Sequence, residues 1–347
     1  MAPNGFLAAA RAPPMIAAST MAQLGEFELI ARYFTRPVRR AALGVGDDCA
    51  LLAVAPGMSL AVSSDMLVEG RHFVSTVSPE RLGHKALAVN LSDLAACGAR
   101  PLAFTLALAL PDADEAFLAP FARGLLALAD RHACELVGGD TTRGPLTVAI
   151  SVFGEVPVGA ALLRSGARPG DDVYVSGTLG DARLALEVLR GTVAVEGQAF
   201  ERLRRAMEEP QPRVVLGLAL AGIATSAIDV SDGLAGDLGH VLRRSGVAAV
   251  LEVDALPRSA DLAAQPGALQ RECLLAGGDD YELVFTAPAG RRSAVAEAAL
   301  AAATGVTRIG RIEPGQGLRL VDAAGHDVQG LASSFDHFRT GAAPVPT

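Results

Sequence analysis

Short apolar segments alternate with helix-patterned segments along most of the chain, and this alternation limits its possible folds more than any other feature. In the first half, residues 59–63 and 102–110 read as strands, and residues 81–98 carry the spacing of a helix between them. The second half repeats the pattern, with strands expected at 172–176, 226–230, 247–253, 281–286 and 306–312 and helices at 181–190, 234–245 and 291–303. Such alternation is typical of helices layered on sheets, so we predict an α/β fold built of α+β layers.

The length of the chain predicts more than one domain. Its 347 residues are too many for one ordinary core and suit two domains of about 150 residues each. Between the two halves, RSGARPGD at 164–171 interrupts the pattern with glycine, proline and charge, as linkers and turns do. We predict an N-terminal domain at 25–160 and a C-terminal α/β domain at 161–340, and we expect the Ala- and Pro-rich residues 1–24 to form a disordered tail.

Charge and cysteine content argue against several classes of function. Lys plus Arg number 30 against 38 for Asp plus Glu, a net charge of −8, and no basic run indicates a nucleic-acid-binding face. The longest apolar stretches, 102–110 and 214–223, are shorter than the ~20 residues that a membrane span requires. The four cysteines form no C-x-x-C pair, which argues against a zinc site and a disulfide framework and favours a reducing cytoplasm.

Acidic residues recur beside glycine or serine, at positions that read as strand ends or loops. They occur as GDD at 46–48, SSD at 63–65, SD at 92–93, GGD at 138–140, DVSDG at 229–233 and GGDD at 277–280. If several of these segments meet at one sheet edge, their carboxylates repel one another by several kcal/mol unless cations lie between them. The alternative is a set of helix N-caps and surface turns, which also use Asp and Ser.

The chemistry of these side chains indicates which cation they would hold. Carboxylate and hydroxyl oxygens select hard ions, so Mg²⁺ is the natural candidate, and it usually completes its shell with substrate phosphates. The chain has no G-x-x-x-x-G-K-[ST] and no protein-kinase motif, so a nucleotide would be held in another way. SGTLG at 176–180 is either a phosphate cradle or a tight turn, and Lys85 and Asn90 lie either in the site or on a solvated helix face.

Seven segments of the chain resemble the thiamine-monophosphate kinase family, in order and from about residue 25 to residue 338. They are GEFELIARYF at 25–34, GVGDDCALL at 44–52, KALAVNLSDLAACGARP at 85–101, LVGGDTTRGPL at 136–146, RSGARPGD at 164–171, AIDVSDGLAGDLGH at 227–240 and GGDDYELVFT at 277–286. The resemblance implies ATP-dependent phosphorylation of thiamine monophosphate to thiamine diphosphate, with several Mg²⁺ ions. It also implies the fold shared with aminoimidazole ribonucleotide synthetase, in which N-terminal domains pair strands across a homodimer.

The resemblance also assigns roles to individual residues. The implied metal positions are Asp48, Ser63, Ser64, Asp65, Asp93, Asp140, Asp229 and Asp232, of which Asp93, Asp140 and Asp232 are also implied to be catalytic. The implied nucleotide contacts are Gly139, Asp140, Arg164 and Ser231, and the implied thiamine phosphate contacts are His72, Asp279 and Phe335. The chain departs from the family pattern at Ser64, where Thr is usual, and at Asp279, where Glu is usual.

Other activities need residues that this chain lacks or places elsewhere. Selenophosphate synthetase on this fold needs an N-terminal reactive Cys, and the hydrogenase-maturation relative needs a C-terminal Cys. This sequence begins without Cys and ends in GAAPVPT, so both activities are disfavoured. A carboxylate-metal phosphohydrolase would usually add His ligands, whereas His72, seven residues after Asp65, is the only histidine that we take as a candidate for the site. A non-catalytic thiamine diphosphate carrier is the third possibility.

Overall fold

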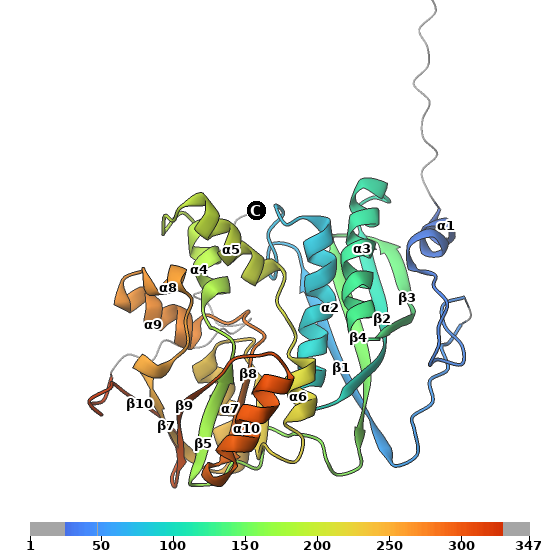
Figure 1. Ribbon diagram of the computed structural model, residues 1–347. Coiled ribbons are helices and arrows are strands. Elements are labelled where there is room, and N and C mark those ends of the chain that lie inside the picture. Colours follow the sequence, from blue (N-terminus) through green and yellow to red (C-terminus); the bar gives the residue numbers. More distant parts are fainter. Residues whose placement is uncertain (1–24, 47, 329–347) are drawn as a thin grey trace, which may run out of the picture.

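The computed structural model describes residues 25–46 and 48–328, which form two layered α/β units side by side (Figure 1). The expected tail at 1–24 and Phe335 lie outside these residues. Within the described part, no helix is both long and apolar enough to cross a membrane. The two-domain α/β fold predicted from the sequence is confirmed, with one sheet in each half.

The first unit is a four-stranded sheet covered by two long helices, preceded by a short helical arm. Its sheet has the order β1-β4-β2-β3, and only the β2–β3 pair is parallel. The elements are α1 (Glu26–Leu29), the π-helical turn η1 (Ile30–Phe34), β1 (Met58–Val68), α2 (Pro79–Ala96), β2 (Arg100–Leu110), α3 (Glu115–Arg131), β3 (Glu135–Arg143) and β4 (Thr147–Pro157).

The second unit is a six-stranded sheet of order β10-β7-β9-β5-β8-β6, in which only β10 and β7 pair in parallel. Its strands are β5 (Asp171–Ser176), β6 (Ser226–Asp229), β7 (Ala248–Glu252), β8 (Leu283–Pro288), β9 (Val306–Glu313) and β10 (Gly317–Val321). Its helices are α4 (Asp181–Leu189), α5 (Gly197–Glu208), α6 (Val214–Ala219), α7 (Leu234–Ser245), η2 (Val253–Ala255), α8 (Ala260–Ala263), α9 (Gly267–Ala276), η3 (Ala289–Arg291) and α10 (Arg292–Ala301).

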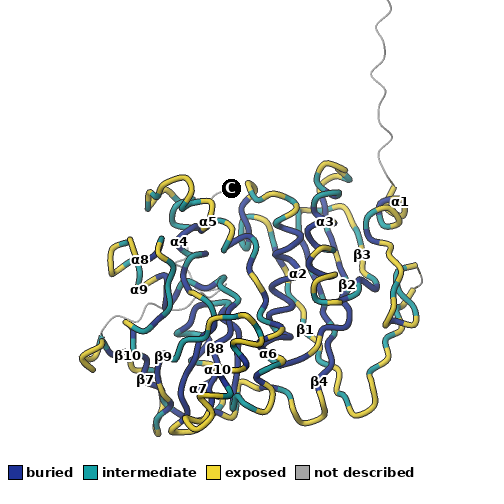
Figure 2. The backbone as a smooth tube through the Cα atoms, in the orientation of Figure 1, coloured by how far each residue is buried: buried dark blue, intermediate teal, exposed yellow. Residues whose placement is uncertain are grey.

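Helix α2 lies between the two units and is buried along most of its length (Figure 2). It begins after Ser78, whose side chain accepts a hydrogen bond from Arg81 N at 3.3 Å, and Pro79 fits the first turn because no N–H is needed there. One continuous apolar core joins α2 residues such as Leu87 to Phe285 on β8. The two units therefore share a core instead of meeting at a polar interface.

Three of the six acidic segments do not lie at strand ends or in loops, where the sequence analysis placed them. Ser63–Asp65 lies inside β1, Asp93 lies in the last turn of α2, and β3 continues through Gly138–Asp140. For these three segments the expectation of strand ends or loops is therefore wrong, whereas Asp229 does end β6 and residues 277–280 do lie in a loop. Most strand pairs are antiparallel, so no single edge collects the carboxyl ends of the strands.

Helices α2 and α3 touch backbone to backbone at two glycines. A Cβ added at Gly83 would lie 2.1 Å from Phe121 O, and one added at Gly124 would lie 1.8 Å from Glu80 O. Neither backbone oxygen can move away without shifting a helix. This close contact fixes the position of α2, and hence of every side chain that it carries.

We predict that Gly124→Ala lowers the free energy of unfolding, although alanine favours a helix by about 1 kcal/mol. The clash with Glu80 O should outweigh that gain and give a net loss of about 1–3 kcal/mol in urea denaturation. Gly239→Ala on α7 is the control, because its Cβ would meet only the flexible end of Arg243, at 3.3 Å. Equal stability changes in the two variants would contradict close packing of α2 on α3.

Candidate functional site

Four carboxylates from both units lie close together beside α2. Asp65 lies on β1 and Asp93 on α2, whereas Asp229 ends β6 and Asp232 lies in the loop before α7. Ser63 Oγ donates to Asp93 Oδ2 at 2.5 Å, and Ser92 Oγ donates to Asp229 Oδ2 at 2.8 Å. We call Asp65, Asp93, Asp229 and Asp232 the carboxylate cluster.

Neighbouring carboxylates help to raise the pKa of two members of the carboxylate cluster, Asp65 and Asp229. Burial is the largest cause that raises the pKa of Asp65 to about 6, and the negative charges of Asp93 and Asp232 add to it. Burial and the charge of Asp93 raise the pKa of Asp229 to about 8, although the hydrogen bond from Ser92 opposes the shift. The cluster therefore carries more negative charge than the surrounding protein neutralises.

Arg164 is the cation that acts on this cluster from the segment between the two units. Its positive charge lowers the pKa of Asp93, against the larger effect of burial, which raises it. Arg164 also lies near His240 on α7, whose pKa it lowers. Arg164 is an exposed residue, so its charge acts on the cluster while the side chain remains accessible to solvent.

The loop before α7 is held in place by a carboxylate that the sequence analysis missed. Asp237 Oδ2 accepts hydrogen bonds from Ser231 N and Asp232 N, each at 3.0 Å. Burial, followed by the charge of Asp232, raises the pKa of Asp237 to about 7. Gly233 is required here, because a Cβ on it would lie 2.9 Å from Ala276 Cα and its φ is 112°.

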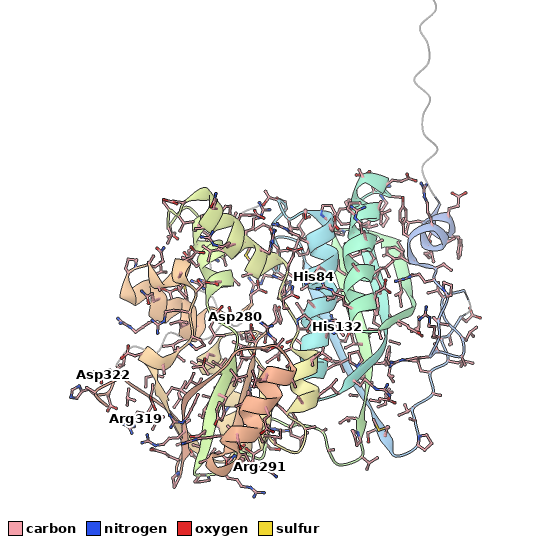
Figure 3. All side chains as sticks on the ribbon, in the orientation of Figure 1. His84, His132, Asp280, Arg291, Arg319 and Asp322 are labelled. Atoms are coloured by element: carbon pink, nitrogen blue, oxygen red, sulfur yellow. The ribbon has the colours of Figure 1, made fainter. Side chains whose placement is uncertain are left out.

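The loop GGDDYE at 277–282 connects three parts of the protein through its carboxylates. Asp279 Oδ2 lies 2.6 Å from Lys85 Nζ on α2. Asp280, which Figure 3 labels, accepts a hydrogen bond through Oδ1 from Gly180 N at 2.8 Å at the start of α4. Glu282 pairs with Arg213 at the start of α6. Since Gly180 N donates to Asp280 and Leu179 N to Pro257 O, the SGTLG segment is a tight turn and offers no N–H cradle from these two residues.

Ser64 is separated from the other predicted metal positions by the alternation of β1. Ser63 and Asp65 face α2, where Ser63 bonds Asp93 and Asp65 N donates to Asn90 Oδ1 at 3.1 Å. Successive strand residues point to opposite faces, so Ser64 points away from α2, where its Oγ bonds Ile150 O and Ser151 Oγ.

Asp140 and Gly139 lie across the sheet from the carboxylate cluster. In the strand register, Asp65 is level with Ile150 on β4, Leu106 on β2 and Gly139 on β3. Three strand spacings separate Asp65 from Gly139, about 14 Å. Gly139 is also required by packing, because an added Cβ would lie 1.8 Å from Leu106 O.

The remaining predicted residues lie outside the cluster or outside the described residues. Asp48 is an exposed residue in a bend, and His72 follows β1 with its Nδ1 accepting a hydrogen bond from Val68 N at 3.0 Å. Ser231 lies in the α7 loop, where its carbonyl accepts from Asp279 N at 2.8 Å. Phe335 falls outside the described residues.

Several residues that organise the site were not predicted. Besides Asp237, they include Ser92, which bonds Asp229, and Tyr281, whose hydroxyl hydrogen-bonds Asp279 and lies near Asp65 and Asp229. One signal in the sequence could have found Ser92: it and Asn90 are polar residues inside an apolar helix pattern, and a buried polar side chain requires a hydrogen-bond partner.

The donor set suits Mg²⁺ held together with a substrate. Within residues 25–46 and 48–328, no three His, Cys, Asp or Glu side chains form a ready metal cage. Mg²⁺ does not need one, since it is usually held by one or two carboxylates, waters and substrate phosphates. The raised pKa values of Asp65 and Asp229 show that their negative charges lack compensation in the protein alone. A divalent ion bound to these oxygen ligands would supply it.

Two family models match the chain along most of its length. The N-terminal domain of AIR synthase related proteins matches residues 46–156, and the C-terminal domain of AIR synthase related proteins matches residues 168–323. The fold and the carboxylate cluster between its halves thus place the chain in the class of AIR synthase related proteins.

The relatives narrow this class to one family. The chain is 46% identical over 324 residues to the thiamine-monophosphate kinase of Salmonella typhimurium, covering 91% of this chain and 99% of the relative. The chain belongs to the thiamine-monophosphate kinase family, a family of enzymes.

Solved structures of relatives share the fold. The crystal structure of thiamine-monophosphate kinase from Stenotrophomonas maltophilia K279a has a TM-score of 0.78 and 46% identity, covering 85% of this chain and 94% of that chain. AaThiL complexed with AMPPCP and TMP has a TM-score of 0.72 and 31% identity, covering 82% of this chain and 89% of that one. The comparisons therefore agree in fold and in family.

We predict that Asp93→Asn stabilises the metal-free protein relative to wild type, increasingly as pH rises. The folded-state pKa of Asp93 lies above its ordinary value of 3.8, so the stability that its protonated form provides is lost as pH rises through the folded-state value. The measurement is the difference in Tm between variant and wild type from pH 5 to pH 8 in chelator. Burial lowers the pKa of His84, His132 and His240, so these histidines make both proteins more stable as pH rises. Because this contribution is common to variant and wild type, it cancels in the difference in Tm.

Addition of Mg²⁺ provides the control for the same variant. A ligand that binds only the folded state raises Tm, so Mg²⁺ with an ATP analogue should raise the Tm of wild type more than that of Asp93→Asn. The variant should also lose turnover. A Tm difference that shrinks as pH rises, or a variant with a normal rate, would contradict the role given to Asp93.

Proposed function

We propose that this chain transfers the γ-phosphoryl group of ATP to the phosphate of thiamine monophosphate, giving thiamine diphosphate and ADP. The observation that carries the proposal is the carboxylate cluster between the two units, which has raised pKa values and an exposed arginine beside it. Membership in the thiamine-monophosphate kinase family, and a relative whose structure contains AMPPCP and TMP, support this choice of substrates.

The residues of the cluster are proposed to hold Mg²⁺, with ATP as the co-substrate. When bound, Mg²⁺ would shield the negative charges of the two substrates from each other. Asp65, Asp93, Asp229 and Asp232 suit this role by their proximity; Asp48, Ser63, Ser64 and Asp140 remain metal positions proposed from the resemblance alone. The positions proposed to contact ATP are Gly139, Asp140, Arg164 and Ser231, and those proposed to contact the thiamine phosphate are His72, Asp279 and Phe335.

The chain's own residues position the reactants and need not move a proton. The acceptor is a phosphate oxygen that is already anionic, so no general base is required. Arg164 would bind a phosphate while the loop fixed by Asp237 holds Ser231 and Asp232 in place. Catalysis is then mainly alignment and charge compensation, in which Asp93, Asp140 and Asp232 are the proposed catalytic carboxylates.

A homodimer through β1 is the second part of the proposal. β1 is an edge strand, and Leu60, Val62 and Met66 on its outer face are 45%, 58% and 57% exposed. An open strand edge bearing an apolar row is a surface that proteins usually cover. A second copy of the chain, pairing its own β1 there, would cover it.

The cellular setting and the domain limits complete the proposal. All four cysteines, each within the described residues, are free thiols, which supports a reducing cytoplasm. We propose that 25–160 and 161–340 are the two domains, because the four-stranded sheet ends at Pro157 and the six-stranded sheet begins at Asp171.

We predict that the purified protein, given ATP, Mg²⁺ and thiamine monophosphate, forms thiamine diphosphate and ADP in equal amounts. Free thiamine should not replace the monophosphate, because its alcohol would need a general base. Chelation of Mg²⁺ should stop the reaction. Chromatographic product analysis distinguishes the alternatives: phosphate release without thiamine diphosphate would indicate a phosphohydrolase, and binding without turnover would indicate a carrier.

We predict that Val62→Asp converts the dimer into a monomer, because it places a charge in the middle of the apolar row. Sedimentation velocity at micromolar concentration measures the change. Leu300→Asp on α10 is the matched control, since Leu300 is 81% exposed but lies in the other unit, and it should remain dimeric. A wild-type protein that is monomeric at this concentration would refute the dimer.

A further inference from the structure

Lys85 is the only lysine in the chain, since the other 29 of its 30 Lys and Arg residues are arginine. Its side chain is 2% exposed, on the buried helix α2. Among the described residues it is the only lysine or arginine in the buried class. Burying an ammonium group costs several kcal/mol unless the group is paired and hydrogen-bonded, so the position requires an explanation.

The Lys85 ammonium joins two separate segments of the C-terminal half. Nζ donates to Met207 O near the end of α5 at 2.9 Å and to Asp279 Oδ2 at 2.6 Å. An ammonium directs its N–H groups tetrahedrally from one point, whereas the donors of a guanidinium lie in one plane. A single lysine can therefore reach a carbonyl and a carboxylate that lie in different directions.

Arg81, one turn earlier on α2, attaches this helix to α5 without contacting Asp279. Its guanidinium pairs with Glu208 at 3.1 Å, with Glu209 at 3.6 Å and with Glu201. His84 adds a bond from its ring Nε2 to Pro210 O at 2.8 Å (Figure 3). Since α5 is already held by these residues, attachment of α5 does not account for the contact between Lys85 and Asp279.

Asp279 belongs to a loop whose backbone is strained and tightly held. The φ angles of Asp279 and Tyr281 are 62° and 53°, in the left-handed region that side chains other than glycine seldom adopt. Their N–H groups donate to Ser231 O and Val230 O at 2.8 and 2.9 Å, which holds the loop against the one that carries Asp232. A strained loop that neighbouring contacts hold rigidly is typical of a functional site.

The two side chains of the Lys85–Asp279 ion pair differ in solvent exposure. The side chain of Lys85 is 2% exposed, whereas that of Asp279 is 33% exposed. The Tyr281 hydroxyl hydrogen-bonds Asp279 and lies near Asp65 and Asp229 of the carboxylate cluster. The Asp279 carboxylate is therefore held from behind while one side remains accessible next to the cluster.

We infer that Lys85 is a positioning residue, whose ammonium orients the Asp279 carboxylate toward the cationic thiamine part of the acceptor substrate. This inference rests on the proposed function, in which Asp279 contacts thiamine monophosphate. The thiazolium ring is positively charged, so a carboxylate held beside it provides both attraction and orientation. Lys85 belongs to the N-terminal unit and Asp279 to the C-terminal unit, so acceptor binding depends on how the two units dock.

The kinetic test compares Lys85→Met with Arg81→Met, two changes on the same helix. Lys85→Met should raise KM for thiamine monophosphate by about tenfold or more and leave KM for ATP within about twofold. Arg81→Met should lower Tm but leave both KM values within about twofold, because Arg81 does not touch Asp279. A Lys85→Met variant with an unchanged KM for thiamine monophosphate, or with equal increases in both KM values, would overturn the inference.

A double-mutant cycle with Asp279→Asn tests whether Lys85 acts through Asp279. The double variant should bind thiamine monophosphate about as weakly as Asp279→Asn alone, because the partner that Lys85 orients is already lost. Effects that multiply would show that the two residues act separately and would contradict the inference. Absence of turnover in the wild type would instead refute the proposed function.

A spectroscopic test uses the wild-type protein and so remains valid if Lys85→Met does not fold. Protein labelled with ¹³C at lysine Cε, made without lysine in any tag, should give one side-chain resonance, because Lys85 is the only lysine. Thiamine monophosphate should shift this resonance, and a non-hydrolysable ATP analogue with Mg²⁺ should leave it in place. No shift with thiamine monophosphate, or an equal shift with both ligands, would overturn the inference.

Discussion

Helix α2 is buried on nearly all sides, so each of its polar side chains must find a partner inside the protein. Leaving such a group unpaired costs about 1–3 kcal/mol, and more if it is charged. Lys85 pairs with Asp279, Ser92 with Asp229, and Asn90 with the backbone of Asp65. Two of these partners, Asp279 and Asp229, lie in the other unit. The hydrogen bonds that pair the polar side chains of α2 therefore also dock the two units and build the site between them.

The carboxylate cluster depends on this docking. Each unit supplies two of its four carboxylates, and the raised pKa values of Asp65 and Asp229 reflect charges brought together across the boundary. The apolar core that α2 shares with the second sheet stabilises an arrangement that the carboxylates alone would oppose. Function and stability thus act in opposite directions here, and Mg²⁺ with its substrates is the expected source of compensation.

The sequence predicted the elements better than it predicted their arrangement. Helix 234–245 was predicted with the boundaries that α7 has, and the predicted strand at 102–110 lies within β2, because local periodicity determines both. The same reasoning ended the first strand at residue 63, whereas β1 continues to Val68. Alternation along that longer strand explains why Ser64 points away from the face that carries Asp65. The mostly antiparallel pairing depends on long-range contacts that a single sequence does not reveal.

The pairs that build the site were the least predictable part. The family motif led to Asp229 and Asp232, but not to Asp237, whose bonds to the Ser231 and Asp232 backbone depend on the turn of a loop. The partner of Lys85 is 194 residues away in sequence, on a different unit. Polar residues on a buried helix indicate that such partners exist, but only the folded structure identifies them.

The most direct test of the account is a crystal structure with Mg²⁺, a non-hydrolysable ATP analogue and thiamine monophosphate bound together. We expect metal density at about 2.1 Å from carboxylate oxygens of both units, including Asp93 of α2 and at least one of Asp229 and Asp232. We also expect the substrate phosphates to lie beside these carboxylates, where the metal would offset the negative charge of both. Metal and nucleotide bound elsewhere, with the carboxylate cluster free of both, would contradict the account.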